Sequence, residues 1–410
     1  MQLSSEQKVL GPRSLLLCLI VIDLATIFAV DMYAPALTNL QDEFGVTASY
    51  LNLTMFMFFV VAAIGVVVAG PMSDRMGRRP LLIAGSAVFA ASSLGCAVAP
   101  NVAVLVVFRM GEALGYGINT TVATAAVEDA YEGPSLKTAM TCIQSLIVIG
   151  PAIAPFLGTG ILSVSGWRMI FVFLAMVGLG AVIVSLLISE TMPAEARKQS
   201  STVGQALEDM VRDIRELLRN KSFASLTLIL GIMGVPYFAF ISVASYVILD
   251  YYGESYLVYS LLYSMICVVS VIAPFVYSAM SKRMHGSKVL KICFVLTFVT
   301  VALLVAIGHE SALLFMLALV PYALAEGIGR PLSFMVLLDQ PENLVGSSSS
   351  CANFAYNIIP AFATVIATLP WPDFVTGVIA ITAVCAVLVV ILYAWGLRDQ
   401  SLDHGFGTGD

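Results

Sequence analysis

Twelve long apolar runs follow one another along this chain, and this succession limits the folds that it can adopt. Hydrophobic residues make up 59% of the 410 residues and charged residues only 11%, so a soluble fold could not cover its surface with polar groups. A helix needs about 20 apolar residues to cross a bilayer, and it satisfies its own backbone hydrogen bonds. We therefore predict an all-α integral membrane protein with twelve transmembrane helices. The predicted helices cover residues 14–36, 48–69, 80–98, 102–125, 138–162, 167–188, 222–248, 256–279, 289–307, 312–337, 346–368 and 373–395.

The positive charges are unevenly distributed and indicate an orientation. Of the 20 lysines and arginines, 17 fall in the terminal segments or in loops on one side of the predicted helices. Positively charged loops of this kind are cytoplasmic in most membrane proteins. We therefore expect a multi-pass protein of the cell (cytoplasmic or inner) membrane, with both termini in the cytoplasm. The basic residues on this side are Lys8, Arg13, Arg75, Arg78, Arg79, Lys137, Arg197, Lys198, Arg212, Arg215, Arg219, Lys221, Lys282, Arg283, Lys288, Lys291 and Arg398.

Several classes of function lack the residues that they need. The seven cysteines have no C-x-x-C spacing and the three histidines form no cluster, so we expect neither disulfides nor a metal site. The sequence contains no nucleotide-binding loop and no His, Cys and Ser constellation, which argues against an enzyme, a cofactor and ATP as the energy source. The net charge is −6 without a basic patch, so we expect no nucleic-acid partner. The first apolar run carries two acids and no cleavage site, and is therefore not a cleavable signal peptide.

The chain divides around its longest hydrophilic stretch. A weak internal repeat, MSDRM at 72–76 and MSKRM at 280–284, supports two pseudo-symmetric halves related by an axis along the membrane normal. The stretch between the halves contains an amphipathic helix, as expected for a segment at the membrane surface. We predict an N-terminal six-helix bundle at 1–193, a cytoplasmic linker at 194–221, a C-terminal six-helix bundle at 222–398 and a cytoplasmic tail at 399–410.

The loop at 70–80 is short, rich in Gly, Pro and charge, and lies between two predicted helices. Its sequence, GPMSDRMGRRP, resembles the signature loop between the second and third transmembrane helices of the major facilitator superfamily at every defined position. The resemblance implies the major facilitator fold. It also implies a cytoplasmic gate formed by Gly70, Asp74, Arg75, Gly77, Arg78 and Arg79. We expect Asp74 to face the start of the eleventh helix, around Gly346 to Ser350, where free backbone N–H groups favour an anion.

A pattern in the fifth predicted helix resembles the motif that marks exporters of this superfamily. Gly150, Pro151, Pro155 and Gly158 carry it. Gly and Pro let a helix bend and approach its neighbours closely, although an ordinary kinked helix would also contain them. Residues 31–37, DMYAPAL, at the end of the first predicted helix, resemble the corresponding residues of the drug:proton antiporters with twelve transmembrane helices. This group is associated with bicyclomycin and chloramphenicol resistance, so the resemblance implies an antibiotic-resistance exporter.

Six charged residues lie well inside predicted helices, away from the helix ends, and a charge at the bilayer centre costs about 2.5–3.5 kcal/mol. They are Asp23, Asp31, Arg109, Glu112, Glu326 and Arg330. Asp23 and Asp31 are separated on one helix by a rise of about 12 Å, so both can line one cavity at different depths. A carboxylate that holds either a proton or a cationic substrate couples the two fluxes, and the resemblance implies two acids at this spacing. We expect Asp31 to be the principal coupling residue and Asp23 to tune it, unless Asp23 is only a polar residue at the cytoplasmic mouth.

Arg109 begins the fourth-helix pattern R-x-x-Q-G of the superfamily, in which the arginine influences proton binding nearby. This chain departs from the pattern, because Glu112 replaces the glutamine and Ala113 the glycine. Glu112 either pairs with Arg109 at i, i+3 or is a third protonatable site, and both interpretations stay open. Glu326 and Arg330, at i, i+4, form a similar pair in the second half, for which a structural bridge is the simpler interpretation.

Polar and aromatic side chains inside the predicted helices are the candidates for a substrate cavity. Such walls suit loosely specific binding of lipophilic molecules, although they also fill ordinary membrane helices. We predict a monomeric, proton-driven exporter of lipophilic compounds, cationic ones among them. A metabolite exporter or a proton symporter on the same fold is the alternative. The candidate cavity residues are Tyr33, Tyr116, Asn119, Tyr237, Phe240, Tyr356 and Asn357.

Overall fold

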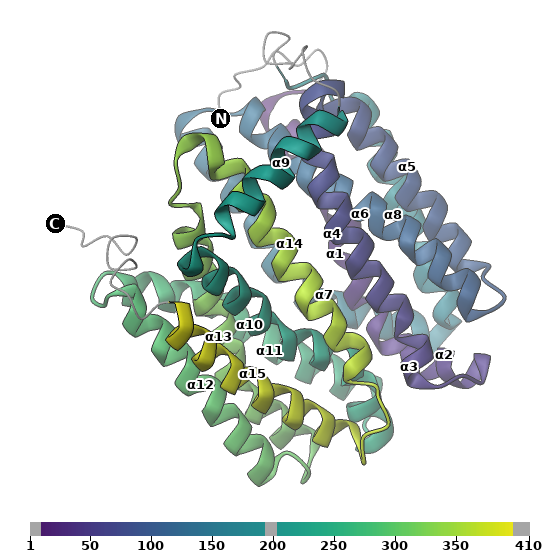
Figure 1. Ribbon diagram of the computed structural model, residues 1–410. Coiled ribbons are helices and arrows are strands. Elements are labelled where there is room, and N and C mark those ends of the chain that lie inside the picture. Colours follow the sequence, from purple (N-terminus) through teal and green to yellow (C-terminus); the bar gives the residue numbers. More distant parts are fainter. Residues whose placement is uncertain (1–9, 193–202, 397–410) are drawn as a thin grey trace. The chain divides into compact units, whose positions relative to one another are not determined.

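The computed structural model of this chain describes residues 10–192 and 203–396, which contain helices and no β-strand. The chain forms two units (Figure 1). Unit 1 comprises Met1–Val46 and Leu53–Glu208, and unit 2 comprises Thr47–Asn52 and Asp209–Asp410. Several parts of the sequence predictions lie outside the described residues. They are the tail at 399–410, the first part of the linker at 194–202, and the charges of Lys8, Arg197, Lys198 and Arg398.

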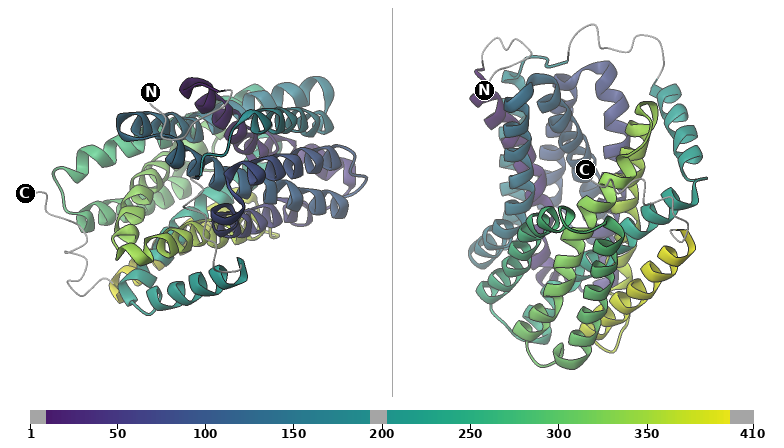
Figure 2. Two further views of the ribbon diagram at one scale, coloured as in Figure 1. Left: turned by 90° about the horizontal axis from the view of Figure 1, so that it is seen from above. Right: turned by 90° about the vertical axis from the view of Figure 1, so that its left-hand side faces the viewer.

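Unit 1 is arranged around one long central helix. Helix α6 contacts α1, α4, α5 and α7, while α8 packs against α1 and α5. The long helices are visible in both views of Figure 2. The described elements of this unit are α1 (Pro12–Asp31), the 3-10 turn η1 (Ala34–Ala36), α2 (Leu37–Phe44), α4 (Leu53–Met76), α5 (Arg78–Ala97), α6 (Val102–Ala130), α7 (Gly133–Ser165) and α8 (Trp167–Leu187).

Glycines on α6 allow its close approach to the neighbouring helices. A Cβ atom at Gly117 would lie 2.7 Å from the backbone oxygen of Ala62 in α4, and one at Gly115 would lie 2.6 Å from that of Gly85 in α5. Only glycine fits at such distances, and small residues at helix crossings are the usual means of packing helices in lipid. These contacts fix the position of α6, which carries Arg109.

Unit 2 repeats this plan with six further long helices among its described residues. Polar caps mark the beginning of three of these helices. The side chain of Asn220 accepts from the N–H groups of Ser222 and Phe223, and Ser255 and Ser311 cap the helices that begin at Tyr256 and Ala312 in the same way. The described elements are α3 (Ala48–Leu51), α10 (Lys221–Ser245), the π-helical turn η3 (Tyr246–Tyr251), α11 (Tyr256–Ser281), α12 (Gly286–Ile307), α13 (Ala312–Leu338), α14 (Glu342–Ile366) and α15 (Phe374–Gly396).

Helix α9 (Val203–Leu217) carries the amphipathic stripe predicted for the linker. Ile214 and the buried Leu217 pack into the apolar core of unit 2, and Asp213 accepts a hydrogen bond of 3.1 Å from Ser347 of α14. Val211 and Leu218 remain exposed. Part of the stripe is therefore covered by protein, and its exposed part is available to lipid.

The prediction of an all-α membrane protein with twelve long helices is confirmed. Each predicted range overlaps one of the twelve helices of 20 residues or more that the described part of the chain contains, although the bounds differ: the range 48–69 includes α3, and α4 continues to Met76. Ten helical segments among the described residues are long and apolar enough to cross a membrane. Helix α7 contributes a shorter apolar stretch, Ile149–Ser165, and α14, which begins at Glu342, contains the polar run Ser347–Ser350 in its first half.

The first predicted helix differs from the observed one at its end. The prediction runs unbroken over 14–36, whereas α1 ends at Asp31 and η1 begins at Ala34. Pro35 lies in η1 and lacks the N–H group that a continuing α-helix would need. Asp31 is therefore the last residue of α1.

Candidate functional site

The guanidinium of Arg109 lies at a fully buried position in unit 1. Its Nη1 donates to the backbone oxygen of Ala29 in α1 at 3.0 Å. The guanidinium carbon lies 4.6 Å from the ring centre of Tyr33, 4.2 Å from that of Phe58 and 5.9 Å from that of Phe171. Aromatic faces attract a cation, most strongly where water is excluded. Three helices and the residues after α1 thus hold a positive charge at a fixed position inside the unit.

Glu112 binds this arginine directly. Its Oε2 accepts from Arg109 Nη1 at 2.6 Å, and its Oε1 accepts from the hydroxyl of Ser93 in α5 at 2.7 Å. The side chains of Glu112 and Arg109 are both 0% exposed. The predicted i, i+3 contact is therefore present, and each carboxylate oxygen has a donor. Arg109 Nε and Nη2 have no hydrogen-bond partner among the described residues.

The two acids of α1 lie on either side of the Arg109 contact. Ala29 follows Asp23 by six residues and precedes Asp31 by two, which corresponds to rises of about 9 Å and about 3 Å. Asp23 is 1% exposed, and neither carboxyl oxygen has a hydrogen-bond partner in the described part of the chain. Asp31 is also buried. A buried carboxyl group without donors needs a proton, a cation or water, because its desolvation is otherwise uncompensated.

The cavity candidates of unit 1 are largely enclosed by protein. The hydroxyl of Tyr33 pairs with that of Thr54 at 2.8 Å, and the ring of Tyr116 lies 5.5 Å from that of Phe58. Asn119 is fully buried, and its Nδ2 has no hydrogen-bond partner within residues 10–192 and 203–396. Tyr33 therefore belongs to the surroundings of Arg109, and Asn119 retains an unused donor.

The predicted exporter motif lies where α7 crosses α1. A Cβ atom at Gly150 would overlap Cγ2 of Ile27, and one at Gly158 would lie 2.5 Å from the backbone oxygen of Met32. Pro151 and Pro155 are inside α7, as predicted. The two glycines thus contact residues 27–32, at the end of α1 and just after it. This segment contains Asp31 and the carbonyl of Ala29. A larger residue at Gly158 must move this segment, because the atoms that it would meet belong to the backbone of Met32.

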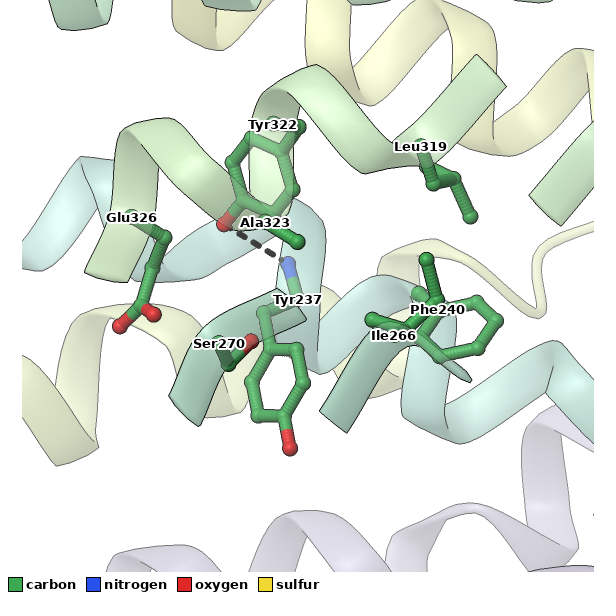
Figure 3. A pocket seen from close by; sticks show the side chains of 8 residues that line it. All are labelled: Tyr237, Phe240, Ile266, Ser270, Leu319, Tyr322, Ala323 and Glu326. Carbon is green, nitrogen blue, oxygen red and sulfur yellow. Dashed lines mark hydrogen bonds between the residues drawn. The ribbon is translucent and has the colours of Figure 1, made fainter. Parts of the chain in front are cut away.

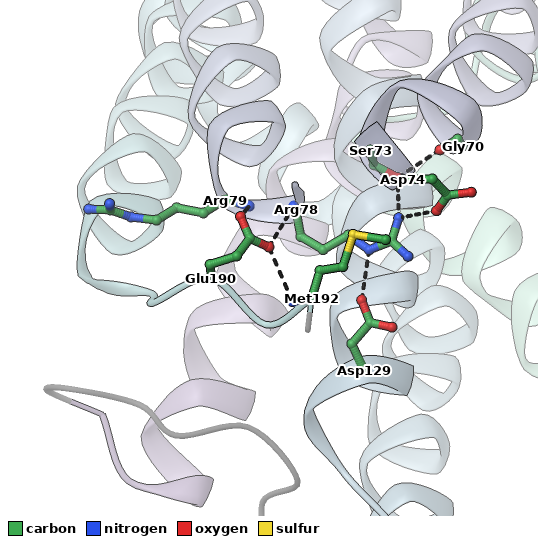
Figure 4. Close-up of polar contacts among 8 residues, drawn as sticks. All are labelled: Gly70, Ser73, Asp74, Arg78, Arg79, Asp129, Glu190 and Met192. Atoms are coloured by element: carbon green, nitrogen blue, oxygen red, sulfur yellow. Dashed lines mark hydrogen bonds and ion pairs between the residues drawn. The ribbon is translucent and has the colours of Figure 1, made fainter. Parts of the chain in front are cut away.

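The signature loop forms a network of charges around one arginine (Figure 4). Gly77 is the single residue between α4 and α5, and its φ of +91° is one that favours glycine. The side chain of Arg78 is 9% exposed and donates at 2.8 Å to both Asp74 and Asp129. Arg78 also donates to the hydroxyl of Ser73. The loop therefore links the ends of α4, α5 and α6.

Glu190, which follows α8, caps the beginning of α5. Its carboxylate accepts from the backbone N–H of Arg78 at 2.8 Å, from that of Arg79 at 3.4 Å and from that of Met192 at 3.2 Å. A negative charge at the start of a helix binds unpaired N–H groups and is favoured by the helix dipole. The guanidinium of Arg79 donates to the backbone oxygen of Leu186 at 2.9 Å. Three hydrogen bonds thus connect the beginning of α5 to the end of α8 and to Glu190 after it.

The remaining predicted gate residues have local roles. The backbone oxygen of Gly70 accepts from the hydroxyl of Ser73 at 2.9 Å, and Arg75 lies in the last turn of α4. Asp74 is part of the Arg78 network and is 38% exposed. Its expected contact with residues 346–350 stays a prediction.

The cavity candidates of unit 2 contribute to a pocket between α10, α11 and α13 (Figure 3). Two of them, Tyr237 and Phe240, form part of its wall, together with the predicted Glu326. The walls are mainly aromatic and aliphatic, with one carboxylate. The pocket is lined by Tyr237, Phe240, Ile266, Ser270, Leu319, Tyr322, Ala323 and Glu326.

The predicted second-half pair meets at a tyrosine. The hydroxyl of Tyr356 donates to Oε1 of Glu326 at 2.7 Å, and the guanidinium carbon of Arg330 lies 4.2 Å from the centre of the same ring. Tyr356 therefore bridges α14 to both charged residues of α13. The fourth candidate, Asn357, donates to the backbone oxygen of Asn353 at 2.8 Å within its own helix.

Some residues of these networks were missed by sequence reasoning. Ser93 and Asp129 supply partners to Glu112 and Arg78, and Tyr322 lies in the wall of the pocket. Asp129 is an acid near the end of an apolar helix, a signal that could have placed it beside the basic loop. The serine and the tyrosine carry no such signal, because both are common in membrane helices.

Known proteins similar to this chain are membrane transporters. The sequence matches the family model described as Major Facilitator Superfamily over residues 19–364. It is 27% identical over 326 residues to the uncharacterized MFS-type transporter YdgK of Bacillus subtilis (strain 168), covering 78% of this chain and 80% of that protein. A chloramphenicol resistance protein of Pseudomonas aeruginosa is 30% identical over 250 residues, covering 61% and 58%. The multidrug transporter MdfA of Yersinia pestis bv. Antiqua (strain Angola) is 27% identical over 235 residues, covering 57% and 56%.

Solved structures of transporters have a similar fold. A bacterial homolog to the human lysosomal transporter Spinster has a TM-score of 0.75 at 17% sequence identity, covering 97% of this chain and 99% of that chain. A D-xylose-proton symporter has a TM-score of 0.71, also at 17% identity, covering 93% and 97%. At these identities the likeness shows the fold alone.

Proposed function

Because this chain belongs to the major facilitator superfamily, and is a multi-pass membrane transporter and not an enzyme, we propose that it exports lipophilic compounds in exchange for protons. Cationic compounds are among the proposed substrates. Export proceeds by alternating access, with the signature loop as the cytoplasmic gate and the monomer as the functional unit. The named activities of the chloramphenicol resistance protein and of MdfA support drug export, since both are related to this chain.

The observation that carries the proposal is the state of the acids on α1. Asp23 is buried without a donor to its carboxyl oxygens among the described residues, and Asp31 lies buried at the end of the same helix. A buried carboxyl group without a donor, as at Asp23, is stable when it binds a proton or a cationic substrate, and it cannot bind both at once. We assign the principal coupling step to Asp31, and we assign to Asp23 the attraction of the cationic group of a substrate.

Arg109 and Glu112 support this exchange from the neighbouring helix. Arg109 donates to Glu112 and to the backbone oxygen of Ala29. Glu112 neutralises its charge, so neither Asp23 nor Asp31 is needed to do so. The contact with Ala29 fixes the last turns of α1, which end at Asp31. In this proposal Arg109 and Glu112 position Asp31 and do not titrate themselves.

Proton release on substrate addition tests the proposal. Purified protein in weakly buffered detergent solution is titrated with a panel of lipophilic cations, neutral drugs and hydrophilic metabolites while the pH is recorded. An antiporter releases protons on binding lipophilic compounds. Uptake of protons on binding would indicate a symporter, and a response limited to hydrophilic metabolites would indicate a metabolite exporter.

A further inference from the structure

A tyrosine hydroxyl bridges one turn of α10 from outside. Tyr322 of α13 donates to the backbone oxygen of Met233 at 2.5 Å and accepts from the backbone N–H of Tyr237 at 3.1 Å. These two backbone groups are four residues apart and are the pair that bond to each other in an undisturbed α-helix. The dashed line in Figure 3 marks the contact between Tyr322 and Tyr237.

The bridged turn is the one that contains a proline. Pro236 lies inside α10, immediately before Tyr237. Its ring removes one N–H donor and crowds the carbonyl of Ile232 one turn earlier, which bends or opens a helix. Side chains that supply hydrogen bonds at such a turn are a recognised way of holding a bent helix in lipid. Tyr322 is 4% exposed, so water has little access to replace its hydroxyl.

The same turn forms the wall of the pocket in unit 2. Tyr237 and Phe240 are one turn apart on α10, and both line the pocket together with Tyr322 and Glu326. The direction of the Tyr237 and Phe240 side chains depends on how far the turn around Pro236 is open. The Tyr322 hydroxyl contacts the backbone on both sides of Pro236, at Met233 and at Tyr237.

We propose that Tyr322 is a positioning residue of the substrate site. Its hydroxyl holds the turn from Met233 to Tyr237 in a bent state and thereby places Tyr237 and Phe240 against a lipophilic substrate. This role rests on the proposed export function, because it assigns the pocket to the transported compound. The role should affect the affinity for substrate, because Tyr237 and Phe240 form the wall against which the substrate packs.

Tyr322→Phe tests the proposal, because it removes only the hydroxyl. Loss of the bridge should raise the KM for transport of tetraphenylphosphonium about three- to tenfold while kcat changes less than about twofold. Tyr277→Phe is the matched control. Its hydroxyl in α11 contacts the sulfur of Met335 at 3.8 Å, away from the pocket, so KM should stay at the wild-type value. A purely structural role of Tyr322 would lower the amount of folded transporter and leave KM unchanged, which would overturn the proposal.

A double-mutant cycle with Pro236→Ala tests the mechanism. Alanine restores the N–H and removes the ring, so the turn closes with its own hydrogen bonds and no longer needs the bridge. Tyr322→Phe should then raise KM less than about twofold in the Pro236→Ala background, which is a strong coupling between the two sites. Effects that simply multiply would show that the hydroxyl does not act through this turn.

Hydrogen exchange separates this proposal from the proposed function. The backbone amides around Tyr237 should exchange faster in Tyr322→Phe than in the wild type. In the Pro236→Ala background, the same amides should exchange at one rate whether residue 322 is tyrosine or has been changed by Tyr322→Phe. This measurement needs no transport. If the wild type neither exports a compound nor releases protons, the proposed function fails. If the amides exchange at equal rates in wild type and Tyr322→Phe, the bridge has no positioning role.

Discussion

Arg109 and Glu112 form an ion pair of 2.6 Å in which both side chains are fully buried. Glu112 is the residue at which the chain departs from the R-x-x-Q-G pattern, since it supplies a carboxylate where the pattern has the amide of a glutamine. Ser93 occupies the second oxygen of Glu112. With both oxygens bonded, the geometry favours a structural pair over a third titrating site.

The first prediction concerns this pair. Glu112→Gln retains an oxygen acceptor for Arg109, whereas Glu112→Ala leaves a buried cation unpaired and should cost about 3–5 kcal/mol of stability. Thermal unfolding of purified protein should therefore show a large loss for alanine and a smaller one for glutamine. The number of protons released per substrate should stay the same in Glu112→Gln. A fall in that number would identify Glu112 as a titrating site instead.

The second prediction concerns the gate. Asp74 and Asp129 both bind Arg78 at 2.8 Å, so the two asparagine variants remove comparable contacts. If Asp74 also holds the gate, Asp74→Asn should reduce transport about tenfold more than Asp129→Asn, at nearly unchanged ligand affinity. Transport assays in proteoliposomes and equilibrium binding measure the two quantities. Equal losses in both variants would leave Asp74 with no role beyond the Arg78 network.

The third prediction concerns the crossing of α7 and α1. Gly158→Ala places a methyl group 2.5 Å from the backbone oxygen of Met32, so the helices must separate, at a cost of about 1–3 kcal/mol. Gly160→Ala is the control in the same helix, because no atom lies within 4 Å of its Cβ position. The first variant should unfold at a lower temperature and transport poorly, while the second should match the wild type. Similar behaviour of both would mean that the crossing is not tightly packed.

The fourth prediction concerns acid stability. Asp373, before α15, is partly buried, which raises its pKa, but hydrogen bonds from Thr376 and the nearby His309 more than offset this and leave the pKa lowered. A carboxyl whose pKa is lower in the folded state stabilises the fold above its unfolded pKa of about 3.9, and this contribution is lost as the pH falls through the folded value. Asp373→Asn should therefore be less stable than the wild type at neutral pH, and the difference should shrink below about pH 4. Thermal unfolding between neutral and acidic pH measures this difference, and a difference independent of pH would contradict the linkage.

The helices themselves could be predicted from the sequence, because a run of about 20 apolar residues leaves the backbone few alternatives in lipid. The turn at Gly77 could be predicted as well, but the loop expected over 70–80 was too long, because α4 continues to Met76 and α5 begins at Arg78. The break after Asp31 was missed, although Pro35 is a signal for it.

The partners within the site could not be predicted in the same way. Helices in lipid are apolar on every side, so the sequence does not show which face of α5 brings Ser93 to Glu112. The bridge from Tyr322 to α10 joins residues 85 and 89 positions apart, and only the rotation of both helices brings them together. The proline that requires the bridge could be seen, but not the side chain that supplies it.

The most direct test of the coupling mechanism is proton release from purified Asp31→Asn beside the wild type. Tetraphenylphosphonium serves as the cationic probe and chloramphenicol as the neutral one, with binding measured in parallel. An amide cannot exchange a proton, so we predict that the wild type releases protons with both probes, whereas Asp31→Asn releases none and still binds chloramphenicol. Proton release by Asp31→Asn at the wild-type level would contradict the assignment and place the coupling site elsewhere, with Glu112 as the next candidate.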